Sequence, residues 1–344
     1  MATQDTRTDD AFEVAGSLPS IDGLVFRHLR APGDYPAMNA VANRVRAADG
    51  ELFATTDADF AAYYGALPHC DPATDVAIVT VDDVVVAYGR VTSERLRALD
   101  RASIHQVMCF VDPIWRRHGI GRALQETLEA RADVIAVGER RGSPIRLRVE
   151  AEDVAVGTVA LVTRAGYRPV RYWYTMRRPT LDDQPDRPLP AGLEIREVRP
   201  EHLQAIWAAE VEAVEDHWGN SEVGEEEYLE FVNHADPEAT SLWRIAWDGD
   251  EVAGQVRSYI NEDVNRRDGV QRGFVENITV RRPWRRRGLA SALIAASFPL
   301  LRARGMTEAV LGVDTENPSG ALGLYESMGF EPTARSTTWE KPLS

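Results

Sequence analysis

The segment RRPWRRRGLASAL, residues 281–293, places five arginines around a glycine and before an apolar-periodic run. The first turn of a helix carries unpaired N–H groups and the positive end of the helix dipole, so it attracts anions. Gly288 and Ala290 let a phosphate approach the backbone, and arginines supply fork-shaped donors. The turn therefore predicts a pyrophosphate site. Its candidate residues are Arg285, Arg286, Arg287, Gly288, Leu289, Ala290 and Ser291.

A basic run also occurs as a solvated face or as a patch that contacts nucleic acid. The chain has 39 Lys and Arg against 54 Asp and Glu, a net charge of −15, which opposes broad attraction to nucleic acid or to an anionic membrane. Whatever the arginines bind is local. With only Cys70 and Cys109, no signal-like N-terminus and no apolar run of bilayer length, we expect a soluble cytoplasmic protein.

The first half of the chain repeats the turn. "VDPIWRRHGIGRAL" begins at position 111 and "VRRPWRRRGLASAL" at position 280, and "LVFRHLR" (24–30) precedes "LEIREVR" (193–199) by the same 169 residues. Two matches in one register predict a tandem duplication. We expect domains over 20–178 and 193–344, joined by a proline-rich linker over 179–192. The first copy adds four candidate residues, Arg116, Arg117, Gly119 and Gly121.

The elements around the second turn follow from hydrophobic periodicity and turn residues. We expect a hairpin turning at 248–250, a strand over 273–280, a helix from Gly288, a strand over 307–314, a helix over 319–329 and a closing strand after Phe330. Pro299 should kink or shorten the first of these helices. The predicted fold class is α+β, with two tandem domains that each have a mixed central sheet flanked by helices.

These features together resemble the GNAT superfamily of acyl-CoA-dependent N-acyltransferases. The resemblance rests on the R-x-x-G-x-G/A turn between strand and helix, the asparagine one strand later and "ALGLYESMGF" (321–330). It covers nearly the whole chain as two copies. It implies that the turn binds the pyrophosphate of coenzyme A, with acetyl-CoA as donor, a small amine as acceptor and no metal, nucleic acid or membrane. The two-copy arrangement and "EDHWG" (215–219) are similar to mycothiol synthase and its relatives.

The resemblance also implies catalytic roles. A backbone N–H of Ile278, Thr279 or Val280 would hold the thioester oxygen, and Tyr325 would protonate the leaving thiolate. Asn317 would bond coenzyme A, which is compatible with a role as N-cap or turn residue. Tyr325 also has the spacing of a packing residue.

Glu276, on the strand beside the expected thioester, is the candidate base, although a glutamate on a strand is commonly just exposed. His217 is the rival base. Aligning the ends of the two copies sets Val162 against Tyr325 and Val154 against Asn317. Valine donates no proton, so we expect the first domain to be non-catalytic.

The segment 210–230 has nine acidic residues and no basic one. It is either a solvated helix pair or a field that attracts a cationic amine, with Trp218 and Tyr228 as pocket or core residues. The sequence thus favours an N-acetyltransferase active in its C-terminal domain. The alternatives are acetylation of a cysteinyl pseudodisaccharide, as in mycothiol synthase, a non-catalytic acyl-CoA sensor and a nucleic-acid binder. Oligomeric state is left open.

Overall fold

The computed structural model describes residues 11–51, 54–67, 69–97, 101–139, 144–317 and 320–343. Its backbone forms two compact units. The first holds the described residues up to Val170 together with those from Thr337, and the second is Arg171–Ser336. Each has a mixed sheet flanked by helices, so the predicted fold class is confirmed.

The second unit is built on a sheet with the strand order β12-β6-β11-β10-β9-β8-β7. The pair β10 and β11 is parallel, and the pairs β6–β11, β9–β10, β8–β9 and β7–β8 are antiparallel. The predicted hairpin turns at Gly249, whose φ of 56° suits glycine. The strand bounds are β6 (Arg168–Arg178), β7 (Glu194–Arg196), β8 (Trp243–Asp248), β9 (Glu251–Ile260), β10 (Arg272–Val280), β11 (Glu308–Asp314) and β12 (Glu331–Pro342).

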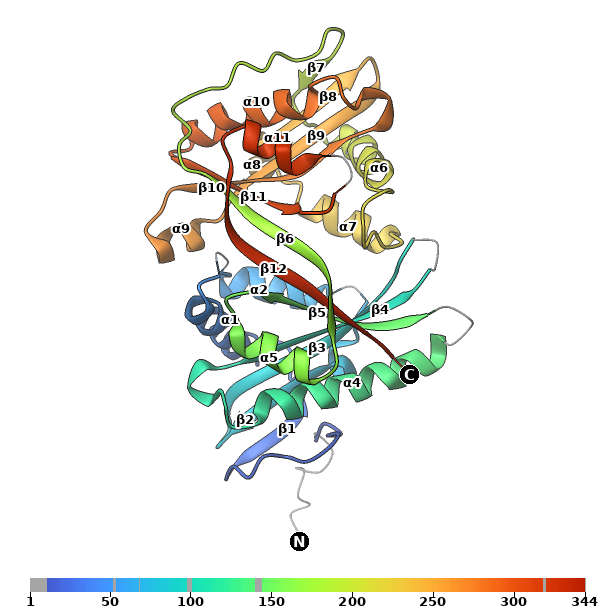
Figure 1. Ribbon diagram of the computed structural model, residues 1–344, viewed down its shortest axis with the longest axis vertical. Helices are drawn as coiled ribbons and strands as arrows, with labels where there is room; N and C mark the ends of the chain where they lie inside the picture. Colours follow the sequence, from blue (N-terminus) through green and yellow to red (C-terminus); the bar gives the residue numbers. More distant parts are fainter. Residues whose placement is uncertain are drawn as a thin grey trace. The chain divides into compact units, whose positions relative to one another are not determined.

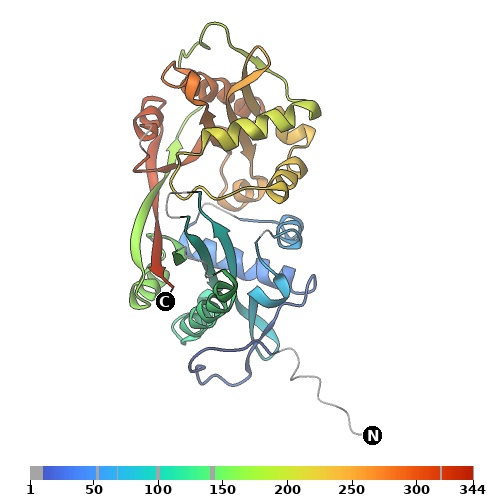
Figure 2. The ribbon, with the colours of Figure 1, turned by 90° about the vertical axis from the view of Figure 1, so that its right-hand side faces the viewer.

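Helices cover both faces of this sheet. On one face, α10 and α11 bury Leu293, Phe298 and Tyr325 in one apolar cluster. On the other, α6 and α7 bury Ile206 and Phe231 in a second cluster. Figures 1 and 2 show α10 (orange) and α6 (yellow-green) on these opposite faces. The helices are α6 (Leu203–Ala213), α7 (Glu225–Asn233), α8 (Pro237–Ser241), α9 (Glu262–Asp268), α10 (Leu289–Ala303) and α11 (Ala321–Ser327).

The first unit repeats the plan, with the strand order β1-β2-β3-β4-β5-β12. Its β4 and β5 are the parallel pair, and α4 packs on β3 and β4 as α10 packs on β9 and β10. The strands are β1 (Leu24–His28), β2 (Val76–Val81), β3 (Val84–Arg95), β4 (Ser103–Val111) and β5 (Ile145–Glu152). The helices are α1 (Tyr35–Asp49), α2 (Asp57–Gly65), α3 (Pro72–Asp75), α4 (Ile120–Glu139) and α5 (Val156–Arg164).

The units differ from the predicted domains 20–178 and 193–344 in one strand each. From Arg171 onward β6 belongs to the second unit, where it pairs with β11. From Thr337 onward β12 belongs to the first unit, where Glu340 pairs with Arg148 at 2.7 Å. Each unit thus completes its sheet with a strand from the other half of the sequence. The segment 179–192 contains no helix or strand, but its Leu181 is only 1% exposed, in the core of the second unit.

Pro299 does not shorten its helix, because α10 continues through it to Ala303. Phe298 and Leu301, on either side of it, are fully buried, and this packing outweighs the lost backbone hydrogen bond. Asn317 is not the N-cap of α11, a position that Gly320 occupies; Asn317 lies in the preceding turn. Ser319, where we expected that helix to begin, lies outside the described residues. In the described part of the chain, no helix is long and apolar enough to cross a membrane.

Candidate active site

The predicted anion turn has the backbone that it needs. After a short 3₁₀ segment, Arg282–Trp284, the chain passes through Arg286 and Gly288 with φ of 60° and 82°, and α10 begins at Leu289. The left-handed conformation at Gly288 reverses the chain between β10 and α10. Because glycine has no side chain, the first N–H groups of α10 stay accessible to a ligand. Gly288 itself is exposed. The turn therefore has the backbone geometry that an anion site at a helix start requires.

Three of the five arginines in this segment are already engaged. Arg281 pairs with Glu212 at 2.8 Å, and Arg282 pairs with Asp216 at 2.7 Å. Arg285 donates to the Val280 carbonyl at 3.0 Å and to the Ala213 carbonyl at 2.9 Å. The guanidinium of Arg285 therefore fixes the backbone around the turn.

Arg286 and Arg287 are exposed and have no ion-pair partner among the described residues. Their guanidinium groups are therefore available to bind an anion such as a phosphate. The predicted residues Leu289, Ala290 and Ser291 form the first turn of α10, where the Ser291 hydroxyl bonds the Gly288 carbonyl at 2.8 Å.

Part of the acidic segment 210–230 is engaged by arginines. Glu210, Glu212, Glu215 and Asp216 all pair with arginines of the same unit. The arginine pairs offset the charge of these four residues, which lie next to the turn, and so weaken their attraction for a cationic amine. The C-terminal end of α6 lies beside the end of β10, because Arg285 bonds the carbonyls of both Ala213 and Val280.

Beyond Phe274 the strands β10 and β11 separate. Their parallel pairing covers only Arg272 to Phe274 on β10, opposite Glu308 to Val310 on β11. On the other side, the pairing of β10 with β9 shifts register between Glu276 and Thr279. Asn277, inside this bulge, has a φ of 50°. A bulge beside an opening between strands leaves backbone groups free of the ladder.

The bulge distinguishes the three residues whose N–H was predicted to hold the thioester oxygen, Ile278, Thr279 and Val280. Thr279 and Val280 are back in register, opposite Gln255 and Gly254. Ile278 has no register partner on β9 in this fully described stretch. We did not predict the bulge from the sequence. Its one local signal is an asparagine inside an apolar strand, because asparagine tolerates a positive φ better than most residues.

Glu276 lies at the start of the opening. Its carboxylate accepts a hydrogen bond from the Gly312 N–H of β11. Gly312 lies two residues past Val310, the last residue of β11 that pairs with β10. Burial raises the pKa of Glu276 to about 7, and the Gly312 hydrogen bond opposes this rise. A carboxylate with a pKa near neutrality, held in an opening between strands, is suited to general-base work.

Tyr325 projects from α11 toward the same region. Its side chain is 7% exposed, and its ring packs edge-on against Phe330 at 6.4 Å between centroids. Among the described residues the Tyr325 hydroxyl has no hydrogen-bond partner. Burial, and then the nearby charge of Glu276, raise the pKa of Tyr325, so the hydroxyl keeps its proton at neutral pH. The structure thus brings the predicted acid and base close to each other.

Comparison with known proteins shows what this arrangement belongs to. The Acetyltransferase (GNAT) family matches residues 203–330. The mycothiol acetyltransferase of Thermobifida fusca is 32% identical over 247 residues, which cover 64% of this chain and 69% of that protein. That of Salinispora arenicola is 29% identical over 277 residues, 76% of this chain and 80% of that protein.

The chain belongs to the GNAT family. It is an N-acetyltransferase of this family with tandem GNAT-fold units. A GCN5-related N-acetyltransferase from Sphaerobacter thermophilus has the same fold, with a TM-score of 0.66 at 24% identity over 95% of this chain and 97% of that one. A tandem GNAT protein from the clavulanic acid biosynthesis pathway has a TM-score of 0.63 at 20% identity, over 93% and 99% of the two chains.

The first unit of this GNAT protein keeps the turn but not the rest of the site. Arg117 and Gly119 have φ of 71° and 90°, as in the second copy. The guanidinium of Arg116, however, forms two hydrogen bonds to Asp49, at 2.7 and 2.8 Å. The side chain of Pro19 lies against Gly119, so close that a Cβ there would be 3.3 Å from it.

The strand before this first turn is also different. Along its described length β4 pairs with β3 without a register shift, from Ser103 to Val111. Val107 stands where the 169-residue offset places Glu276, and it is 2% exposed. Val162 is buried in the core, whereas Val154 is 60% exposed. Among the described residues, the bulge, Glu276 and Tyr325 therefore have no counterparts in the first unit.

Other candidates lie at the edge of the site. His217 is on the loop after α6, and burial, then the charge of Arg285, lower its pKa, so it is a neutral imidazole at pH 7. Trp218 packs edge-on against Trp173 at 6.2 Å, with Arg171 over its ring at 5.5 Å. Tyr228 packs against Trp207 and Phe231 and is a core residue.

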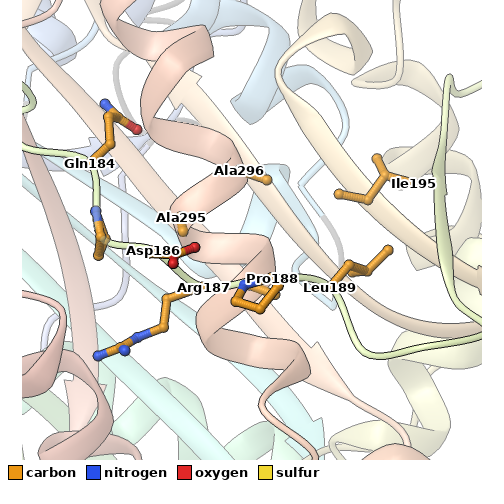
Figure 3. A pocket seen from close by; sticks show the side chains of 10 residues that line it. Gln184, Asp186, Arg187, Pro188, Leu189, Ile195, Ala295 and Ala296 are labelled. Atoms are coloured by element: carbon orange, nitrogen blue, oxygen red, sulfur yellow. The ribbon is translucent and has the colours of Figure 1, made fainter.

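One open pocket of about 450 Å³ lies between the linker and α10 (Figure 3). It is lined by Gln184, Pro185, Asp186, Arg187, Pro188, Leu189, Ile195, Ala292, Ala295 and Ala296. None of these residues is Glu276, Tyr325 or part of the bulge, so the pocket is separate from the opening between β10 and β11. The described residues contain no group of His, Cys, Asp and Glu side chains that could hold a metal ion.

Proposed function

We propose that the second unit transfers an acetyl group from acetyl-CoA to a primary amine of a small acceptor. The observation that carries this is the combination, in one unit, of an open anion turn, a bulge beside separated strands, and an acid and a base at the opening. The pyrophosphate would bind at Gly288 with Arg286 and Arg287, and Asn317 would contact coenzyme A. The pantetheine arm would run between β10 and β11.

The transfer is a direct attack on the thioester. The neutral amine forms a bond to the carbonyl carbon, and the oxygen takes up negative charge beside the N–H of Ile278. Glu276, directly or through water, removes the proton that the attacking nitrogen must lose. The C–S bond then breaks, and the thiolate takes the proton of the Tyr325 hydroxyl. The products are the amide and coenzyme A, and the proton held by Glu276 passes to the Tyr325 phenolate, directly or through water, which restores both groups.

The first unit is proposed to be non-catalytic. Its β4 offers no bulge, Val107 replaces the base, and the turn is packed against Pro19. Its Arg117 and Gly121 could still contact a phosphate, and titration with coenzyme A would show whether they do.

The acceptor is an open choice between two classes. The acidic residues of the segment 210–230, four of which pair with arginines, support a cationic amine. The names of the relatives, which are mycothiol acetyltransferases, favour the cysteinyl pseudodisaccharide that we considered from the sequence. Both are small molecules with a primary amine.

One experiment tests activity and acceptor class together. The protein is incubated with acetyl-CoA and a panel of simple amines, amino acids, aminoglycosides, peptides and a cysteinyl pseudodisaccharide, while the release of free coenzyme A thiol is followed. We expect one class to accelerate release over the background with no acceptor. Tight binding of acetyl-CoA without release for any acceptor would favour a sensor; no binding would refute the proposed function.

A further inference from the structure

Arg257 on β9 is a buried cation that the acyl-transfer chemistry does not use. It is the register partner of Glu276 across the β9–β10 ladder, yet it does not pair with that carboxylate. Its guanidinium instead donates to both carboxylate oxygens of Glu210 at 2.5 Å. Phe231 and Trp243 pack against it, with the guanidinium 5.0 and 5.3 Å from their ring centroids. Two rings and a carboxylate thus fix its position.

The Nε and Nη2 of Arg257 also reach the bulge, and Nη2 is the nitrogen that bonds Glu210. With the Asn277 amide oriented so that its oxygen faces the guanidinium, that oxygen accepts hydrogen bonds at 3.0 and 3.3 Å from Arg257. Asn277 is the residue whose φ of 50° interrupts the ladder. A non-glycine residue in this conformation persists only where its surroundings hold it there. Arg257 supplies that restraint, because α6 anchors the arginine through Glu210.

The first unit offers a natural comparison. The position on β3 that faces Val107 is Val91, and Met108 stands where the second copy has Asn277. We call the hydrogen bonds from Arg257 to Glu210 and Asn277 the clamp. Neither valine nor methionine can form it, and β3 and β4 pair without a bulge. The clamp and the bulge are present together in one copy and lacking together in the described strands of the other.

We propose that Arg257 is a positioning residue that holds the Asn277 bulge and so aims the N–H of Ile278 at the thioester oxygen. The proposal rests on the proposed function, since the oxygen belongs to bound acetyl-CoA. Glu210 has a second effect in this arrangement. By holding Arg257 on the side of α6 it keeps a cation away from Glu276, whose other neighbours are the Gly312 N–H and the phenols of Tyr259 and Tyr325.

The test compares two ligands and needs no acceptor. Coenzyme A has the pyrophosphate but no carbonyl, whereas acetyl-CoA adds the carbonyl that the bulge would bind. One hydrogen bond is worth about fivefold in affinity, so the wild-type chain should bind acetyl-CoA about fivefold more tightly than coenzyme A. Arg257→Met keeps apolar volume between the rings and removes the donors. We expect it to bind coenzyme A as before and to lose the preference for acetyl-CoA, both measured by titration calorimetry.

Two further variants separate positioning from folding. Arg244→Met removes a half-buried arginine of β8 that bonds carbonyls away from the bulge, and it should keep the fivefold preference. Asn277→Gly in the Arg257→Met background should regain part of the preference, because glycine adopts a positive φ without a clamp.

The clamp would be overturned if the preference for acetyl-CoA survived Arg257→Met or if Arg244→Met abolished it equally. It would also be overturned if Asn277→Gly did not restore the preference in the Arg257→Met background. Equal wild-type affinity for the two ligands would also overturn it while leaving the pyrophosphate turn intact. A wild-type chain that binds neither ligand would refute the proposed function itself.

Discussion

The carboxylate of Glu276 lies close enough to the Tyr325 hydroxyl for its negative charge to raise the pKa of that phenol. In the proposed reaction Glu276 takes up a proton before the thiolate leaves. Its charge then disappears, and with it one of the two causes that keep Tyr325 a weak acid. The base therefore makes the acid stronger at the moment when the leaving group needs a proton.

Tyr325→Phe should lower kcat by about 10²–10⁴-fold, the usual contribution of a general acid. The hydroxyl has no partner among the described residues, so its loss should change neither the melting temperature nor the affinity for coenzyme A. The measurement is the rate of thiol release under conditions where chemistry limits turnover. A variant that turns over at the parental rate would show that the thiolate leaves through water.

The activity should depend on the ionisation of Glu276. Its pKa is raised to about 7, so the base form grows as the pH rises through 7, and kcat/KM should rise with it. Because the acceptor amine titrates as well, the informative quantity is the ratio of wild-type to Glu276→Gln activity at each pH. That ratio should increase between pH 6 and 8. A flat ratio would remove Glu276 from the role of base.

The same substitution should affect stability in a pH-dependent way. The folded pKa of Glu276 lies above its usual value of 4.5, so the native state binds this proton more tightly than the unfolded state does. The wild-type chain therefore loses stability as the pH rises from about 4.5 to 7, by about 2–3 kcal/mol. Glu276→Gln should raise the melting temperature more at pH 8 than at pH 5, measured by scanning calorimetry.

Gly288→Glu should weaken coenzyme A binding by at least about 100-fold, because the new carboxylate repels the pyrophosphate. Gly288→Ala is the matched control. It shares the strained φ, and its added Cβ has no nearer neighbour than the Ser291 hydroxyl at 3.9 Å. It should cost about 1 kcal/mol of stability and little binding. Gly119→Glu, in the first unit, should leave turnover intact, and equal losses from the two glutamate variants would contradict the functional asymmetry.

Glu340→Ala should lower the free energy of unfolding of the first unit by about 3 kcal/mol. It removes a 90%-buried carboxylate from Arg148, whose side chain is 7% exposed. Glu316→Ala removes the second, half-exposed carboxylate from Arg171 and should cost less than about 1 kcal/mol. Urea denaturation followed by tryptophan fluorescence measures both, and equal losses would refute the difference in burial as the cause.

Features that depend on neighbouring residues could be predicted from the sequence. The turn at Gly288 is one, because glycine, arginine and the start of an apolar period stand side by side. The hairpin at Gly249 and the repeat at 169 residues are others. Tyr325 and Glu276 came from the resemblance to a family, and the structure brings them close to each other.

The rest depends on which segments meet in space. The bulge at Asn277 exists only relative to β9, and its clamp joins Glu210 and Arg257, which are 47 residues apart. The arginines that pair with the segment 210–230 lie 47 to 69 residues further along the chain, as from Glu210 to Arg257 and from Glu212 to Arg281. No local pattern encodes them, so the sequence left open whether this segment is a solvated helix pair or a field that attracts a cationic amine.

The exchange of strands has a consequence for synthesis on the ribosome. The first unit needs Thr337 and the residues after it to finish its sheet, and these are made after the whole second unit. The second unit needs Arg171–Arg178, which are already available when it emerges. The N-terminal unit, though translated first, is therefore the one that matures last, and β5 keeps an unpaired edge throughout that delay.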